Sequence, residues 1–196
     1  MDHVERFTLE RAWTDLTDET FFWEATSSTW SVRRTSDIRT ATPFGLGDWR
    51  VDFEFPEPLP IPMTSIAWLA WHVGSMPARL VELDFFGGEH TMASGWTSPY
   101  LTHHPIFTNA RDASSAFRDG WSSLRDALTK TTDGQFAARS SGYTYASAPM
   151  ADGLCVLGPP GPERPLTFFV AGLLSEVSHH ATQMCTLRDL YEHRAG

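Results

Sequence analysis

The stretch that decides the fold reads FVAGLLSEVSHHATQMCTLRDLY and spans residues 169–191. Residues three and four positions apart in this stretch share one face of an α-helix, because a helix turns once in about 3.6 residues. The residues of this face are Phe169, Leu173, Glu176, His180, Met184, Leu187 and Tyr191. Only Glu176 and His180 break its apolar character. We therefore predict a helix over about 167–191, with an acid and a histidine one turn apart on its core-facing side.

The rest of the chain contains three further helical patterns separated by long loops. Each pattern has apolar residues at helical spacing and a polar residue that can cap its first turn. These helices are expected over about 2–26 with a break near 17–18, from Thr64 or Ser65 to the glycines at 87–88, and over about 112–130. The loops are expected over 27–62, with a short strand at 49–55, and over 131–165. The predicted fold class is therefore all-α, a four-helix bundle that forms a single domain over residues 1–196.

The composition limits the kind of partner and compartment. The chain has 196 residues and a net charge of -9, and its Lys and Arg residues do not cluster, so we expect no nucleic-acid partner. No segment has the roughly 20 apolar residues of a membrane span, and the N-terminus lacks the apolar run of a signal peptide. Cys155 and Cys185 form no disulfide framework, so a cytoplasmic location is expected. A monomer and a homodimer both stay open.

Glu176 and His180 are the residues most suggestive of chemistry. An acid and a histidine on a core-facing side are costly unless something satisfies them. A divalent metal does so, because it binds a carboxylate oxygen and an imidazole nitrogen together. His72, beside the apolar stripe of the second predicted helix, is the histidine best placed to supply a third ligand. The alternative is that Glu176 and His180 form a plain hydrogen-bonded pair and that His72 is a core histidine with a backbone partner.

Three pieces of the sequence, in this order along the chain, resemble the DinB superfamily of metal-binding helical bundles. The first is LTDETFFWE at 16–24, followed by WSVR at 30–33. The second is TSIAWLAWH at 64–72, which resembles the segment that carries the family's first metal histidine. The third is EVSHHATQ at 176–183, followed by Leu187 and Arg188, which resembles the family's His-x-x-x-His stretch followed by Gly-Gln. Two departures are Ala181-Thr182 before Gln183, and Glu176 where many members have His.

The resemblance implies a metal site made of His72, Glu176 and His180. A His/Glu/His set is similar to the branch that includes mycothiol-dependent maleylpyruvate isomerase. The implied function is a metal-dependent thiol transferase or isomerase that joins a small-molecule electrophile to a low-molecular-weight thiol such as mycothiol. The donor set favours zinc and also suits nickel. The alternatives are a non-catalytic metal-binding stress or resistance protein and, ranked last, a metal-dependent hydrolase. The aromatic residues Trp49, Phe53 and Trp96 are expected to wall the substrate pocket.

Overall fold

The structure is a computed structural model that describes residues 5–45, 47–54, 56–80, 105–140 and 164–194. Its helices are the π-helix η1 (Glu5–Leu9), α2 (Glu10–Trp13), α3 (Asp18–Phe21), the 3-10 helix η2 (Thr35–Asp37), α4 (Ile66–Val73), α5 (Met76–Leu80), α7 (Ala110–Lys130), α8 (Asp133–Ala137) and α9 (Leu166–Glu192). Its strands are β1 (Val32–Arg34), β2 (Trp49–Val51), β3 (Arg139–Ser140) and β4 (Arg164–Pro165). The expectation of a mainly helical fold is thus confirmed, whereas a single four-helix bundle stays a prediction.

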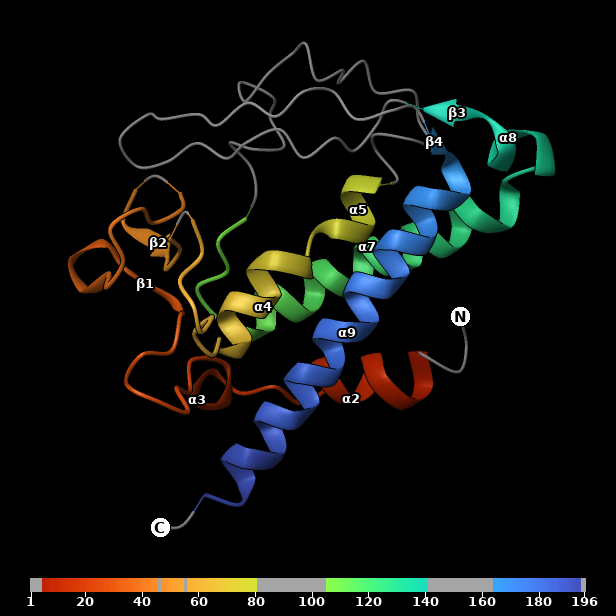
Figure 1. Ribbon diagram of the computed structural model, residues 1–196. Helices are drawn as coiled ribbons and strands as arrows, with labels where there is room; N and C mark the ends of the chain where they lie inside the picture. Colours follow the sequence, from red (N-terminus) through yellow and green to blue (C-terminus); the bar gives the residue numbers. More distant parts are fainter. Residues whose placement is uncertain (1–4, 46, 55, 81–104, 141–163, 195–196) are drawn as a thin grey trace.

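The long helix α9 organises the described part of the molecule. It crosses α4, lies against α5 and α8, and contacts η1 and α2 near its C-terminal half (Figure 1). Its buried residues are Leu166, Val170, Leu173, Val177, Ala181, Met184, Cys185 and Leu187. Glu176 is exposed and His180 half-buried. The helix itself, predicted over 167–191, is confirmed, and its buried face shares Leu173, Met184 and Leu187 with the predicted one but does not include Glu176 or His180.

The physical reason for this difference is that two sets of residues in α9 have helical spacing. The set with Val177 and Ala181 is offset by one residue from the set with Glu176 and His180. Burial selects the apolar set, because an acid in the core costs several kcal/mol unless it is paired. Glu176 and His180 consequently lie at the edge of the buried face, not at its centre.

The N-terminal segment, predicted as a helix over about 2–26 with a break near 17–18, consists of short helical pieces that end at Phe21. The interruption lies between α2 and α3, where Asp15 has a φ of 53° and Thr17 caps α3 by accepting a hydrogen bond from the Thr20 amide. Arg188 of α9 donates to the carbonyl oxygens of Arg11 and Thr14 at 2.6 and 2.7 Å. These bonds satisfy carbonyls that the end of α2 leaves unpaired, and they tie the N-terminal segment to α9.

A buried polar network lies beneath the small sheet that precedes α4. Strands β1 and β2 pair antiparallel, with Val32 opposite Val51. Asp52, fully buried, accepts from Arg33 Nε at 2.6 Å and from the Ser31 amide at 3.1 Å. The strand predicted at 49–55 is thus confirmed for its first three residues, and Asp52 then anchors the loop.

Helix α4 begins where the sequence predicts. Ser65 caps it by accepting a hydrogen bond from the Trp68 amide at 3.2 Å, and its hydroxyl also contacts that of Ser31 at 2.8 Å. The helix is interrupted at Gly74 and Ser75, before Pro77, and resumes as α5. The predicted end of this helix at Gly87-Gly88 lies outside the described residues. The polar network therefore fixes the start of α4, the helix that carries His72.

Helix α7 matches its prediction except at its cap. The cap is Asn109, whose side chain accepts from the Asp112 amide, so the helix begins two residues earlier than expected. Gly120 lies where α7 approaches α5 most closely, since a Cβ there would stand 2.9 Å from the Ala78 amide nitrogen. The glycine is therefore needed for packing between these helices.

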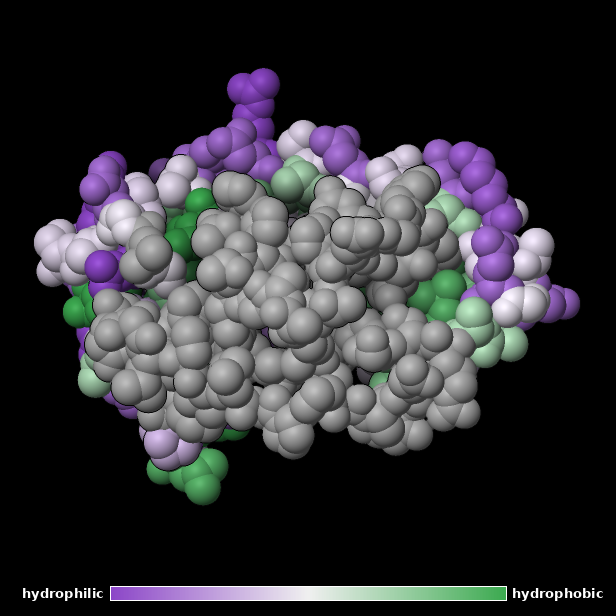
Figure 2. Space-filling model, turned by 90° about the horizontal axis from the view of Figure 1, so that it is seen from above, coloured by the Kyte–Doolittle hydropathy of each residue, from purple (hydrophilic) through white to green (hydrophobic). Residues whose placement is uncertain are grey.

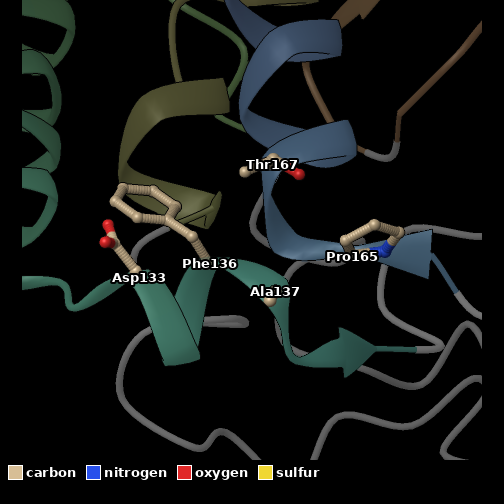
Figure 3. A pocket seen from close by; sticks show the side chains of 5 residues that line it. All are labelled: Asp133, Phe136, Ala137, Pro165 and Thr167. Carbon is tan, nitrogen blue, oxygen red and sulfur yellow. The ribbon is translucent and has the colours of Figure 1, made fainter.

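The region predicted as loop after α7 contains structure that the sequence analysis missed. Thr132 and Gln135 form a capping box that starts α8, and β3 pairs antiparallel with β4. A shallow cavity between α8 and the start of α9 is lined by Asp133, Phe136, Ala137, Pro165 and Thr167 (Figure 3).

Seen from above, hydrophilic residues gather along the upper margin of the described surface (Figure 2). Within the described residues, no helix is both long and apolar enough to cross a membrane.

Candidate metal centre

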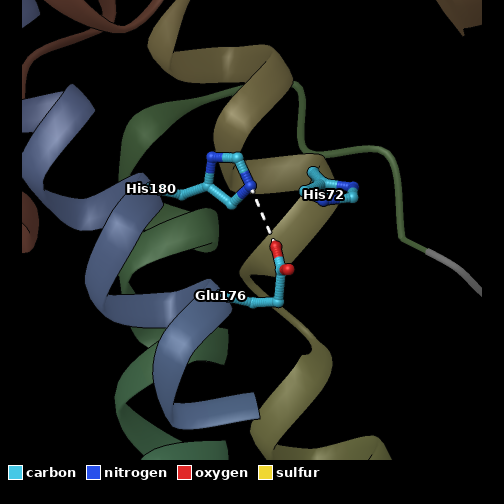
Figure 4. A group of neighbouring side chains, drawn as sticks. All are labelled: His72, Glu176 and His180. Carbon is cyan, nitrogen blue, oxygen red and sulfur yellow. Dashed lines mark ion pairs between the residues drawn. The ribbon is translucent and has the colours of Figure 1, made fainter. Parts of the chain in front are cut away.

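The structure brings together the three residues that the sequence analysis proposed as ligands. His72 comes from α4, and Glu176 and His180 come from α9, which lies beside it (Figure 4). One potential ligand atom from each residue lies within 4.8 Å of the other two. Residues that are about 100 positions apart in the sequence thus converge on one point, while metal binding itself stays a prediction.

His72 is the exception on a buried helix. The other residues of α4 are all buried, namely Ile66, Ala67, Trp68, Leu69, Ala70, Trp71 and Val73. The His72 ring lies nearly parallel to the Trp68 indole, with ring centroids 5.2 Å apart and an interplanar angle of 27°. Trp68 is held in turn, because its indole N–H donates to the Asp52 carbonyl at 2.9 Å. The network around Asp52 therefore restrains the ring on which His72 stacks.

Glu176 and His180 form the second part of the cluster. The Glu176 carboxylate lies 3.3 Å from His180 Nε2, and their side chains are 47% and 14% exposed (Figure 4). Both residues were expected in the core, where their burial would demand a compensating ion. Because Glu176 is about half exposed, water can solvate it, and burial no longer argues for a metal. What argues for one is the convergence of the three side chains.

Both nitrogens of the His180 ring face oxygen atoms. Nδ1 lies 2.7 Å from Gln183 Oε1, and Nε2 lies 3.3 Å from the Glu176 carboxylate. A neutral imidazole carries one N–H, so it can donate to only one of these oxygens. In the neutral ring the other nitrogen then presents a lone pair to an oxygen, which is repulsive, whereas a protonated ring donates to both oxygens. A cation between Nε2 and the carboxylate would convert this repulsion into two bonds.

The separations fit a tetrahedral ion with small adjustments. Zinc bonds of about 2.0–2.2 Å to nitrogen and oxygen place neighbouring ligand atoms about 3.4 Å apart. The 3.3 Å between His180 Nε2 and Glu176 matches this value. The 4.8 Å limit for the whole cluster exceeds it by about 1.4 Å, so the three ligand atoms would have to move closer together to bind one ion. Two imidazoles and one carboxylate suit a borderline ion such as zinc or nickel and leave one position open.

The other histidines of the described residues, His179 and His193, are not part of the cluster. His179 is exposed, with its ring centroid 4.9 Å from that of His180, and the three ligand atoms of the cluster do not include it. His193 contacts the Asp189 carbonyl at the end of α9. The other histidines, His3, His90, His103 and His104, lie outside the described residues.

The loop aromatics that were expected to wall a pocket pack against other aromatic rings. Trp49 lies 6.0 Å from Phe22, measured between ring centroids, and Phe53 lies 5.3 Å from Phe44. Trp96 lies outside the described residues. Two cavities occur elsewhere, one beside α8 and one between η1, α2 and α7, and neither is lined by the three ligand residues. The candidate centre is thus identified by its donor atoms and not by a cavity.

Two supporting residues lie in the motifs that carry the resemblance but were given no chemical role there, namely Trp68 behind His72 and Gln183 beside His180. Each lies three or four positions from the histidine that it contacts, on the same helix. That spacing was visible in the sequence, but it does not say which of several neighbours makes the contact.

Comparison with known proteins adds no relative of this chain. No family model matches it, and no curated protein or solved structure matches it. The assignment of a function therefore depends on the residues of the site.

Proposed function

We propose that the protein is a divalent-metal-binding member of the DinB superfamily with a four-helix bundle fold. We further propose that it uses the metal to join a low-molecular-weight thiol, such as mycothiol, to an electrophile in a transferase or isomerase reaction. The observation that carries the proposal is the convergence of His72, Glu176 and His180 from two helices, with ligand atoms within 4.8 Å of one another.

The packing of the helices supports the bundle. Helix α9 contacts α4, α5 and the N-terminal helices, and α5 packs on α7. Helices packed side by side in this way can build metal sites from carboxylates and histidines on facing helices. The three sequence pieces that resemble the family lie in the N-terminal segment, in α4 and in α9, in the order that the resemblance requires.

The proposed thiol chemistry is supported by the donor set and by the environment of Cys185. His72, Glu176 and His180 would hold the divalent ion, and its open position would supply a place where an added thiol binds as the nucleophilic thiolate. Glu176 adds a negative charge that a third histidine would lack, and its exposure leaves that side of the centre accessible to a small molecule. Burial raises the pKa of the Cys185 thiol, so this cysteine is a poor nucleophile. The one cysteine among the described residues is therefore unsuited to the reaction, and the proposal takes the reactive thiol from an added small molecule.

Metal content tests the proposal directly. We expect about one zinc or nickel ion per chain by elemental analysis, and sharply reduced occupancy for His72→Ala, Glu176→Ala and His180→Ala. His179→Ala is the matched control, because it removes a neighbouring histidine on the same helix and should leave occupancy unchanged. Full metal content in His72→Ala would show that the three residues do not act as one site.

A conjugation assay separates the proposed activity from its alternatives. The metal-loaded protein is incubated with a panel of thiols and electrophiles, and loss of free thiol is measured against the His180→Ala variant. Thiol-dependent turnover that this variant lacks supports a transferase or isomerase. Stoichiometric metal without turnover favours the binding protein, and thiol-independent cleavage of esters or amides favours a hydrolase.

A further inference from the structure

Gln183 contacts the His180 ring at Nδ1, the nitrogen on the opposite side of the ring from Glu176. Its Oε1 atom lies 2.7 Å from His180 Nδ1, three residues earlier on the same helix. We infer that Gln183 is a positioning residue that holds the proton of His180 on Nδ1 and thereby directs the Nε2 lone pair toward Glu176 and His72. This inference rests on the proposed metal site and adds a residue to it.

The neutral His180 ring carries one proton, so only one of its two nitrogens presents a lone pair. A neutral histidine binds a metal through the nitrogen that lacks a proton, and a hydrogen bond at the other nitrogen decides which one that is. An amide oxygen accepts but cannot donate, so Oε1 at 2.7 Å requires the proton on Nδ1. Nε2, which lies 3.3 Å from the Glu176 carboxylate, is then the nitrogen free to bind an ion.

The orientation of the Gln183 amide decides between two states of the cluster. If its NH₂ group faced Nδ1, the ring proton would move to Nε2, and Nε2 would donate to the Glu176 carboxylate. Glu176 and His180 would then form a closed hydrogen-bonded pair that competes with a metal. With Oε1 facing Nδ1, the same two side chains present two electron-pair donors about one tetrahedral edge apart.

Neighbouring hydroxyls on the helix do not compete for the ring. Thr182 donates to the Ser178 carbonyl at 2.9 Å, and Thr186 donates to the Thr182 carbonyl at 3.1 Å. Both bonds remain within the backbone of α9. Thr186 is therefore a suitable control position, since it is exposed on the same helix and its side chain bonds only to the helix itself.

Two substitutions separate the hydrogen bond from the mere presence of a side chain. Gln183→Leu keeps a similar side-chain volume but removes the hydrogen-bond acceptor. Gln183→Glu keeps an acceptor and, unlike the amide, has no NH₂ group that could face the ring instead. Zinc dissociation constants are measured by competition with a chromophoric chelator for the wild type, for both variants and for the Thr186→Val control. We expect about 10–100-fold weaker zinc binding for Gln183→Leu, near-normal binding for Gln183→Glu, and no change for Thr186→Val.

A second readout reports on the ring directly. In the zinc-loaded wild type, the ¹⁵N spectrum of the His180 ring should show a protonated Nδ1 and a metal-bound Nε2. Zinc bound through Nδ1, or equal affinity of wild type and Gln183→Leu, would overturn the inference and leave the metal site standing. A wild-type protein that binds no zinc or nickel would overturn the proposed function together with the inference.

Discussion

Replacing Asp52 by Asn is expected to destabilise the fold by about 3 kcal/mol. Asp52 is fully buried, and three donors point at its carboxylate. Arg33 Nε and the Ser31 amide donate to Oδ2 at 2.6 and 3.1 Å, and the Arg39 amide donates to Oδ1 at 3.1 Å. An Asn side chain keeps one oxygen and places an NH₂ group against at least one of these donors.

The magnitude follows from what each partner loses. Removing one member of a buried ion pair costs about 3–5 kcal/mol, because the other charge is left without compensation. Arg33 keeps its second partner, Glu24, so the lower end of this range applies. For a chain of this size, each kcal/mol lowers the melting temperature by roughly 2–4 °C. We therefore expect a decrease of roughly 6–12 °C.

Urea and thermal unfolding monitored by circular dichroism measure this difference. The matched control is Asp119→Asn, which makes the same chemical change at an exposed position of α7 and should alter stability by less than about 0.5 kcal/mol. A loss below about 1 kcal/mol for Asp52→Asn would show that water reaches the network. The reasoning about its burial would then be wrong.

Three other predictions follow from particular contacts. Gly120→Ala should destabilise the protein by about 1–3 kcal/mol, because the new methyl meets the Ala78 backbone. Its control, Gly172→Ala, has open space around the new methyl and should stabilise the protein by up to about 1 kcal/mol. Urea unfolding compares the two variants, and equal effects on stability would contradict the close packing at Gly120. Burial alone would raise the pKa of Glu24, but hydrogen bonds from two arginines lower it. Its stabilising effect is therefore complete above the ordinary glutamate pKa and is lost as the pH falls through the lowered value, so Glu24→Gln should show a flatter acid limb of melting temperature against pH. Removing the metal with a chelator should lower the melting temperature by roughly 5–10 °C, because zinc at about 100 times its dissociation constant adds about 2.7 kcal/mol of stability. The helical circular dichroism signal should persist at room temperature. Complete unfolding with chelator would contradict a core that is stable without the metal.

The helices were largely predictable because periodicity and capping agree in them. Helix α4 has both signals, a serine cap and a dense apolar pattern, and it begins where expected. The start of α7 was misplaced, because Asn109 and Asp112 are both good caps and only the fold decides between them. β1, β3, β4 and α8 were missed, and β2 is shorter than its prediction, because such short elements carry almost no periodicity. Predictions for residues 81–104 and 141–163 lie outside the described residues.

The candidate site was predictable for a different reason. His72 and His180 each differ from the apolar residues around them, and such exceptions are visible in a sequence without any knowledge of contacts. Which face of α9 is buried was not predictable from spacing, since two faces one residue apart both have helical period. The supporting roles of Trp68 and Gln183 also depend on side-chain orientation, which spacing alone does not give.

The exposure of Glu176 has a functional consequence that the predicted core position would have excluded. A carboxylate in the core would leave the open coordination position of a three-ligand site less accessible from solvent. In the structure, exposure increases from His180, at 14%, to Glu176, at 47%, while His72 is half-buried against Trp68. The cluster is therefore walled on the α4 side and open on the Glu176 side. A small molecule would approach a bound ion from the Glu176 side, because the two histidines and the indole occupy the other. The one-residue offset between the predicted and the buried face of α9 thus removes burial as evidence for a metal. It also leaves the Glu176 side of the cluster exposed, as access to a reactive centre would require.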